Sequence, residues 1–221
     1  GFDTVFIGIE TPEDAGLAEC NKRQNRGRDL IADIKKLQRA GLQVQGGFIV
    51  GFDTDTLSIF RRQIEFIQNS GIVTAMVGML TALPDTKLYA RLNREGRLLA
   101  SSSGNNSDGT TNFLPRMDMD ALRDGYRQLM KTIYAPGPYY RRVRTFLREF
   151  KPSALPFRLH PGGLFAFARS AIRIGVFGRE RFHYWALLGW TVIRRPVLFQ
   201  MAVTLAIYGH HFRRCAEALT D

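Results

Sequence analysis

Carboxylate side chains follow two apolar segments early in the chain, at positions that suit a ligand site. Glu10 and Thr11 come directly after the apolar residues 5–9, and Asp55 follows a second apolar segment that ends at Gly51. Carboxylate oxygens accept hydrogen bonds from the hydroxyl and ammonium groups of ligands. Because glycine has no Cβ, a ligand can approach the backbone of Gly51 closely. These residue types therefore predict a ligand site where the two segments end.

Each of these features also has an ordinary structural explanation. A carboxylate that follows a strand often caps the next helix, and Asp55 precedes a helical pattern formed by Phe60, Ile64 and Ile67. A pair of glycines, such as the one at residues 46–47, often marks close packing of the backbone. Single residues therefore leave both the ligand site and the structural role open.

The apolar residues fall into short runs that alternate with segments of helical periodicity. Short β-branched runs are typical of strands buried on both faces, and apolar residues three or four positions apart are typical of helices. We predict strands at residues 5–9, 42–50 and 72–80, and helices at residues 28–40, 55–71 and 87–96. A helix between consecutive strands makes the strands parallel.

Three parallel strands with two exposed edges would make a poor domain, so we expect these residues to form half of a (β/α) barrel. The active site of such barrels forms at the C-terminal ends of the strands. Glu10, Gly51 and residues 80–86 follow the three strand ends. The chain enters its first strand almost at once, which we interpret as the sign of a fragment.

The residues after about Leu99 predict helices connected by loops. Residues 101–111 are rich in Ser, Gly, Asn and Thr, and residues 134–140 and 151–163 are rich in proline and glycine, which predicts a loop, a turn and a linker. Apolar periodicity predicts helices at residues 119–133, 139–150, 164–174, 181–193 and 196–218. We therefore divide the chain into residues 1–99, a helical extension at 100–150 and a C-terminal helical segment at 151–221.

The net charge of +11 permits contact with phosphates, nucleic acid or anionic lipid, and it equally suits a solvated basic surface. A membrane span needs roughly 20 apolar residues. The apolar segment at residues 196–209 is shorter and contains Gln200 and Thr204, which favours a buried helical hairpin. Trp185 and Trp190 lie near arginines, so a helix pair on a membrane surface stays open as an alternative.

The cysteines and histidines predict no metal site within this chain. Cys20 and Cys215 are the only cysteines, which excludes a disulfide framework and a local zinc or iron–sulfur cluster and suits a reducing cytoplasm. His210 and His211 lie near Cys215, but neighbouring residues on a helix point about 100° apart. We therefore do not expect both histidines to face one metal ion.

Taken in order, the motifs resemble the radical S-adenosylmethionine (SAM) superfamily, in the branch with an N-terminal cobalamin-binding domain. Residues 8–11, Gly-Ile-Glu-Thr, match the Gly-x-Glu-Ser/Thr turn after the fourth barrel strand, and residues 21–22 match a following Asn-Lys pair. Residues 47–56 match the Gly-x-Ile-x-Gly motif of the fifth strand, with Asp55 where glutamate is usual. Residues 84–89, Pro-Asp-Thr-Lys-Leu-Tyr, match the Pro-Gly-Thr-x-Leu-Tyr motif after the sixth strand.

The departures from the common motifs, at residues 52–53 and 84–85, resemble a subfamily that includes the hopanoid methylases. Its members carry a helical domain of unknown function after the barrel, and residues 103–106, 112–113 and 208–210 resemble that domain. The resemblance covers almost the whole chain. It implies an α/β fold class, namely the C-terminal half of a parallel (β/α)6 partial barrel followed by an α-helical domain.

The resemblance implies an enzyme that cleaves SAM at a [4Fe–4S] cluster to form a 5′-deoxyadenosyl radical. Cobalamin-dependent methylation of an unactivated carbon is the expected reaction. The cluster ligands and the cobalamin domain would lie outside this chain, which should be inactive by itself. We expect a small-molecule or lipid substrate, a reductant such as flavodoxin or ferredoxin, and no nucleic acid. The expected location is the cytoplasm, with peripheral membrane contact left open.

The resemblance also implies roles for residues in this half of the barrel. Glu10 would contact the polar part of SAM, and Ile49 and Gly51 would contact its adenine. Thr11, beside Glu10, is also expected among the residues that bind the cofactor. Lys22 would either pair with the SAM carboxylate or remain a solvated lysine.

Asp55 would either contact SAM or cap the following helix, and no catalytic residue is identified. Two alternative functions stay open. One is a radical SAM oxidoreductase or cyclase without methyl transfer, and the other is a basic helical module on a degenerate barrel that binds membranes or nucleic acid.

Overall fold

The computed structural model describes residues 2–99, 109–152 and 161–219. Strands and helices alternate in the first part, in the order β1 (Thr4–Glu10), α1 (Asp14–Glu19), a short 3-10 helix (Arg23–Asn25), α2 (Leu30–Arg39), β2 (Gln43–Val50), α3 (Ser58–Ser70), β3 (Ala75–Met79) and α4 (Lys87–Arg94). The remainder is helical, with α5 (Met119–Tyr134), α6 (Pro136–Glu149), α7 (Pro161–Arg173), α8 (Arg181–Arg194), a 3-10 turn (Pro196–Leu198) and α9 (Phe199–Ala218).

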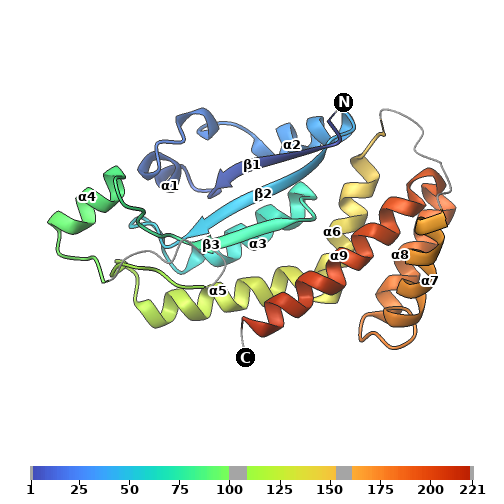
Figure 1. The fold of residues 1–221 in the computed structure, drawn as a ribbon. Coiled ribbons are helices and arrows are strands. Elements are labelled where there is room, and N and C mark those ends of the chain that lie inside the picture. Colours follow the sequence, from blue (N-terminus) through green and yellow to red (C-terminus); the bar gives the residue numbers. More distant parts are fainter. Residues whose placement is uncertain (1, 100–108, 153–160, 220–221) are drawn as a thin grey trace.

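The three strands form one parallel sheet in the order β1-β2-β3. Gly8 pairs with Gly47, and Phe48 pairs with Val77. The predicted α/β class with parallel strands is confirmed, although β3 is shorter than the predicted residues 72–80. All three strands point the same way, and α1 and α4 lie beyond their C-terminal ends (Figure 1).

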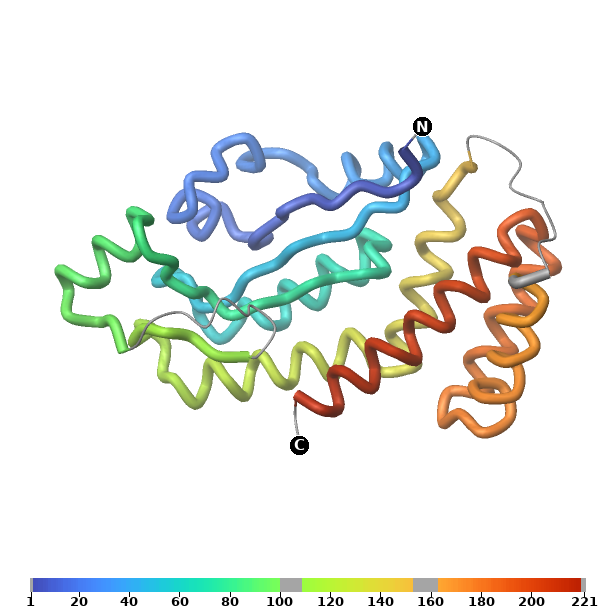
Figure 2. The backbone as a smooth tube through the Cα atoms, in the orientation of Figure 1, coloured from blue at the N-terminus to red at the C-terminus, as the bar shows by residue number. Residues whose placement is uncertain are grey.

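The two faces of the sheet differ in how the chain covers them. Phe48 and Val50 are buried among the residues of the core and share the face on which α2 and α3 pack. Phe6 and Met76 are 58% and 55% exposed. In the described part of the chain no helix covers the face of the sheet opposite to α2 and α3 (Figure 2). The sheet therefore presents one open face with apolar side chains.

Two sequence-based boundaries need correction. The turn predicted at residues 134–140 is wrong, because only Ala135 separates α5 from α6 and Pro136 begins the next helix. Proline is tolerated there because the first-turn N–H groups of a helix lack partners within it. The linker predicted at residues 151–163 ends earlier, since α7 begins at Pro161. Most of the loop at 101–111, including the motif at 103–106, lies outside the described residues.

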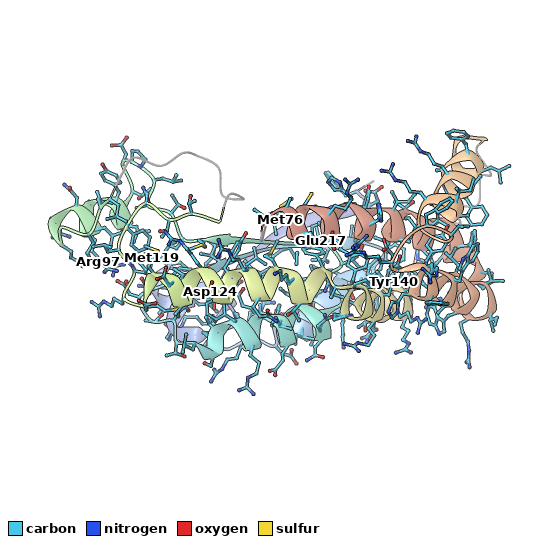
Figure 3. All side chains as sticks on the ribbon, turned by 90° about the horizontal axis from the view of Figure 1, so that it is seen from below. Met76, Arg97, Met119, Asp124, Tyr140 and Glu217 are labelled. Carbon is cyan, nitrogen blue, oxygen red and sulfur yellow. The ribbon has the colours of Figure 1, made fainter. Side chains whose placement is uncertain are left out.

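The buried core continues from the sheet into the C-terminal helices. Helix α5 packs against α3 and α9, and it lies between them when the molecule is seen from below (Figure 3). Leu129, Val143, Leu187 and Leu205 are at most 1% exposed and belong to the same apolar cluster as the strand residues. Burial of this apolar surface is what holds the helices against the sheet.

Side chains from α5 and α6 bind the outer edge of β3 and the residues just before it. Arg142 donates to the carbonyl oxygen of Val73 at 3.2 Å. Two tyrosine hydroxyls of α5 donate to the carbonyl oxygens of the next alternate residues, Ala75 and Val77, at 2.7 and 3.1 Å. Alternate carbonyls of a strand point to the same edge, where a further strand would otherwise pair. The helical extension thus closes the sheet at β3.

The helices of the described segments differ from membrane-spanning helices in their combination of length and hydropathy. No helix within residues 2–99, 109–152 or 161–219 is long and apolar enough to cross a membrane.

Candidate functional site

The C-terminal end of β1 turns sharply at Glu10. Its φ angle is 66°, and the amide of Thr11 donates to the carbonyl oxygen of Ile9 at 2.9 Å, which closes a three-residue turn. A positive φ is uncommon outside glycine, and such strained residues cluster at functional sites. The turn places the Glu10 side chain at the end of the sheet.

Glu10 forms an ion pair with Lys22, whose Nζ lies 3.0 Å from Oε1 of the carboxylate. Both side chains remain accessible, with exposed fractions of 17% and 32%. A Cβ at Gly8 would lie 2.6 Å from the same oxygen and 3.1 Å from Nζ. The absence of a side chain at Gly8 therefore leaves room for the pair above the strand. Lys22 is therefore paired with a carboxylate and is not a purely solvated lysine.

Thr11 has a different environment from its neighbour. Its side chain is completely buried, and its hydroxyl accepts a hydrogen bond from the amide of Glu13 at 3.3 Å. Its methyl group packs where Gly16 of α1 leaves space. The Thr11 side chain thus holds the turn after β1 in place beneath α1.

Asp55 folds back onto the loop after β2. Its Oδ2 accepts hydrogen bonds from the amides of Gly51 and Phe52 at 2.8 and 3.1 Å. The prediction that Asp55 caps the next helix is wrong, because α3 begins at Ser58 after Leu57, without a side-chain cap. The carboxylate instead accepts from the two backbone amides of its own loop. The φ angle of 100° at Gly51 turns the chain so that these amides reach the carboxylate.

Burial changes the acidity of Asp55. Partial removal from water raises the pKa of its carboxyl group to about 6, against the lowering effect of the two amide donors. The ordinary value for this group is 3.8. The loop is therefore held by a carboxylate that titrates close to neutral pH.

A second set of ion pairs and hydrogen bonds holds the same loop. Asp53 pairs with Arg97 at 2.6 Å and with Arg91 at 3.2 Å. Glu19 accepts from the amides of Asp53 and Thr54 at 3.2 and 3.3 Å. The hydrogen bond from Arg97 holds the pKa of Asp53 below its usual range. Sequence reasoning missed this set, because no local pattern connects partners that are 34 and 44 residues apart.

The segment after β3 is held by Asn112. Its side-chain amide accepts from the backbone N–H of Ala82 at 2.8 Å and donates to the carbonyl of the same residue at 2.9 Å. Thr86 caps α4 by accepting from the amide of Tyr89. Asp85 has φ of 62°, the left-handed conformation that glycine prefers, and aspartate tolerates it better than most residues. This accounts for aspartate where the resembled motif has glycine.

The predicted site residues thus fall into two groups. Glu10 and Lys22 are brought together at the edge of the open face, and strand alternation places Ile49 on that same face, opposite to the buried Phe48. The second group is Thr11, Gly51 and Asp55. Thr11 and Gly51 are buried and Asp55 is half-buried, so these residues shape the turns after β1 and β2 rather than the open face.

The arrangement offers a carboxylate, an ammonium group and an apolar floor at one place. When a zwitterionic ligand binds, the carboxylate can accept hydrogen bonds from the ammonium group of the ligand, and the lysine ammonium can pair with the carboxylate of the ligand. The apolar side chains of the open face can take a less polar part of that ligand. Within the described residues, no group of three or more His, Cys, Asp or Glu side chains could hold a metal ion. His210 faces Glu180 at 2.6 Å, whereas His211 faces Cys215.

The fold is that of an α/β protein with a three-stranded parallel sheet, a candidate site at the ends of its strands and a helical extension. Residues 86–221 match the family described as a domain of unknown function, DUF4070, and the chain belongs to this family. The matched region begins at the residue that caps α4 and covers all later helices.

Several named proteins are similar to this chain. An uncharacterized methyltransferase from Synechocystis is 34% identical over 98% of this chain and 41% of its own length. A hopanoid C-2 methylase from Rhodopseudomonas palustris is 27% identical over 95% of this chain and 40% of its own length. A bacteriochlorophyllide d C-12(1)-methyltransferase from Chlorobaculum tepidum is 29% identical over 42% of this chain and 20% of its own length. The chain spans about two fifths of the first two relatives.

Proposed function

We propose that this chain forms the SAM-binding part of a radical SAM methyltransferase. The observation that carries the proposal is the Glu10–Lys22 pair above Gly8, at the C-terminal end of a parallel sheet. The names of three relatives, each a methyltransferase or methylase, support methyl transfer. They favour it over radical chemistry without methylation and over a basic binding module.

The residues at the strand ends suit the chemistry of SAM. The Glu10 carboxylate would accept hydrogen bonds from the ribose hydroxyls or the ammonium group, and Lys22 would pair with the carboxylate of the methionine part. Ile49 would supply apolar surface to the adenine. Asp55 would hold the Gly51 backbone in the shape that admits the ligand, since it already binds that amide.

Two groups bound outside this chain would supply the remaining chemistry: a [4Fe–4S] cluster to reduce SAM and a cobalamin to carry the methyl group. The residues of this chain would bind and orient SAM and shield the reacting carbon from water. Phe6 and Met76, exposed on the open face, would form part of that apolar shield. A small molecule or lipid would be the substrate.

SAM binding provides a direct test. Equilibrium binding of SAM should be measured for the full-length protein that contains this chain, and for its Glu10→Gln and Lys22→Met variants. Loss of a charged hydrogen-bond partner should weaken binding by roughly tenfold or more. Lys131→Met, an exposed lysine on α5, is the matched control and should bind SAM like the unsubstituted protein. Equal affinities for all four proteins would rule out the proposed site.

An anaerobic turnover assay separates the two radical reactions. Formation of 5′-deoxyadenosine together with a methylated product supports the methyltransferase. Cleavage of SAM without any methylated product would instead establish the oxidoreductase or cyclase reaction.

A further inference from the structure

A cationic cavity lies between α7 and α9, away from the strand ends. Its volume is about 440 Å³, and Arg169 and Arg173 of α7 and Arg214 of α9 contribute to its wall. Apolar side chains, including Phe165 and Ile207, form much of the remainder. None of its described lining residues is an aspartate or glutamate. The cavity therefore combines positive charge with an apolar lining.

The three arginines of this cavity have no carboxylate within ion-pair distance among the described residues. By contrast, the neighbouring Arg213 pairs with Glu180 at 3.0 Å and with Glu217 at 2.9 Å. Guanidinium groups suit phosphate especially well, because their planar fork donates two parallel hydrogen bonds. Three unpaired guanidinium groups around one cavity thus point to a phosphate-bearing partner.

The α7–α8 hairpin exposes several large apolar side chains, one of which, Phe165, lines this cavity. Phe165 at the start of α7 is 70% exposed. Phe177 and Phe182, at the connection between α7 and α8, are 79% and 74% exposed, and Ile193 near the end of α8 is 79% exposed. Soluble surfaces rarely expose so many large apolar groups in one region unless they bind something. A free phosphate ion would leave all of this apolar surface in contact with water.

The exposed residues of α8 follow helical spacing. Phe182, Trp185 and Val192 are all exposed and lie three and seven positions apart, so they share one side of the helix. The indole N–H of Trp185 donates to the carbonyl of Gly175 at 3.0 Å, which fixes this side of α8 against the end of α7. Apolar and aromatic residues beside arginines are typical of helices that lie in a membrane interface.

We propose that the α7–α8 hairpin binds the surface of an anionic phospholipid bilayer, with lipid phosphates in the arginine-lined cavity between α7 and α9. Charge complementarity selects this partner, because the arginines supply positive charge and the bilayer surface supplies phosphate beside acyl chains. The hairpin lies at the end of the molecule opposite to the C-terminal ends of the strands (Figure 1). Membrane binding and SAM binding can therefore be separated by mutation.

Vesicle co-sedimentation tests the proposal on the 221-residue chain. The chain should bind vesicles of phosphatidylglycerol and phosphatidylcholine and should not bind vesicles of phosphatidylcholine alone. Each arginine near an anionic surface contributes roughly fivefold to partitioning, so replacing Arg169, Arg173 and Arg214 by Gln should weaken binding by roughly a hundredfold. Replacing Arg61, Arg94 and Arg127 by Gln removes the same charge from the rest of the surface and should change binding by only a fewfold.

The apolar contribution needs its own variant. Phe177→Ser combined with Phe182→Ser should weaken vesicle binding without changing net charge. The Arg169/Arg173/Arg214 variant of the full-length protein should keep its SAM affinity, which distinguishes a failure here from a failure of the proposed function.

Four outcomes of the vesicle experiments would overturn the proposal. They are absence of binding to anionic vesicles, equal binding to neutral vesicles, equal losses in the two arginine variants, and full displacement from vesicles by inorganic phosphate at constant ionic strength. A dimer in light scattering that the Phe177/Phe182 variant dissociates would also overturn it, since the hairpin would then bind a second copy of the chain.

Discussion

The hydroxyl of Tyr134 donates a hydrogen bond of 2.7 Å to the carbonyl oxygen of Ala75 at the edge of β3. Both residues are buried. Tyr126 and Arg142 bind the alternate carbonyls on either side, so the helical extension occupies the edge where another strand would pair. In the described residues β1 pairs with β2 alone. Further strands of a larger sheet would therefore have to add beside β1.

Replacing Tyr134 by Phe should lower the free energy of unfolding by about 1–2 kcal/mol, because the buried carbonyl of Ala75 loses its donor. Tyr208→Phe is the matched control, since Tyr208 is 43% exposed and its loss should cost less than about 0.5 kcal/mol. Urea unfolding of the three chains measures both changes. Equal stabilities of the two variants would show that the edge contact contributes nothing.

Arg142 is completely buried, and no carboxylate lies within ion-pair distance among the described residues. It donates to the carbonyls of Ile133 and Val73 at 2.8 and 3.2 Å and stacks over two tyrosine rings. Arg142→Met should therefore destabilise the chain by about 2–4 kcal/mol, because two carbonyls lose a charged donor. The neighbouring Arg141 is exposed, and Arg141→Met should leave stability nearly unchanged. Chemical unfolding of this pair of variants isolates the effect of burial.

Asp55 should make stability depend on pH. Its carboxyl group has a pKa of about 6 in the folded chain and an ordinary value of 3.8, so the folded state holds the proton more tightly. The stabilising contribution of the protonated group is complete below about pH 4 and is lost as the pH rises through about 6. The Asp55→Asn variant cannot titrate at this position. As the pH rises through this interval, its free energy of unfolding should therefore increase by about 1–2 kcal/mol relative to that of the unsubstituted chain, allowing for solvent screening.

Unfolding of both Asp55 forms at several pH values between about 4 and 8 checks this sign. A stability difference that stays constant across the interval, or that changes in the opposite direction, would contradict the raised pKa.

Gly51→Ala should destabilise the loop after β2 by more than about 1 kcal/mol. Gly51 has φ of 100°, and a Cβ there would lie 3.2 Å from the Leu122 side chain. Gly27 has φ of 65°, which a side chain tolerates better than the 100° of Gly51, and a Cβ there meets nothing within 4 Å, so Gly27→Ala should cost less. A thermal unfolding series should show a larger loss for Gly51 than for Gly27. Identical losses would show that contact with α5 is unimportant.

The sequence by itself determined the alternation of strands and helices, the parallel sheet and most helix boundaries. These follow from local patterns, because apolar spacing reports which side of an element is buried. Glycine at a helix end acts in the same local way: Gly71 follows α3 in the left-handed conformation, with φ of 73°, as predicted. The resemblance in the strand-end motifs likewise needed only the order of residues along the chain.

Only the tertiary structure decided which partners the charged residues find. It pairs Lys22 with Glu10, turns Asp55 back to the Gly51 amide and joins Asp53 to Arg97 across 44 positions. It also places the α5 tyrosines on the edge of β3. Local periodicity encodes burial but not the identity of a distant partner, because a hydrogen bond depends on distances that packing of the whole chain sets.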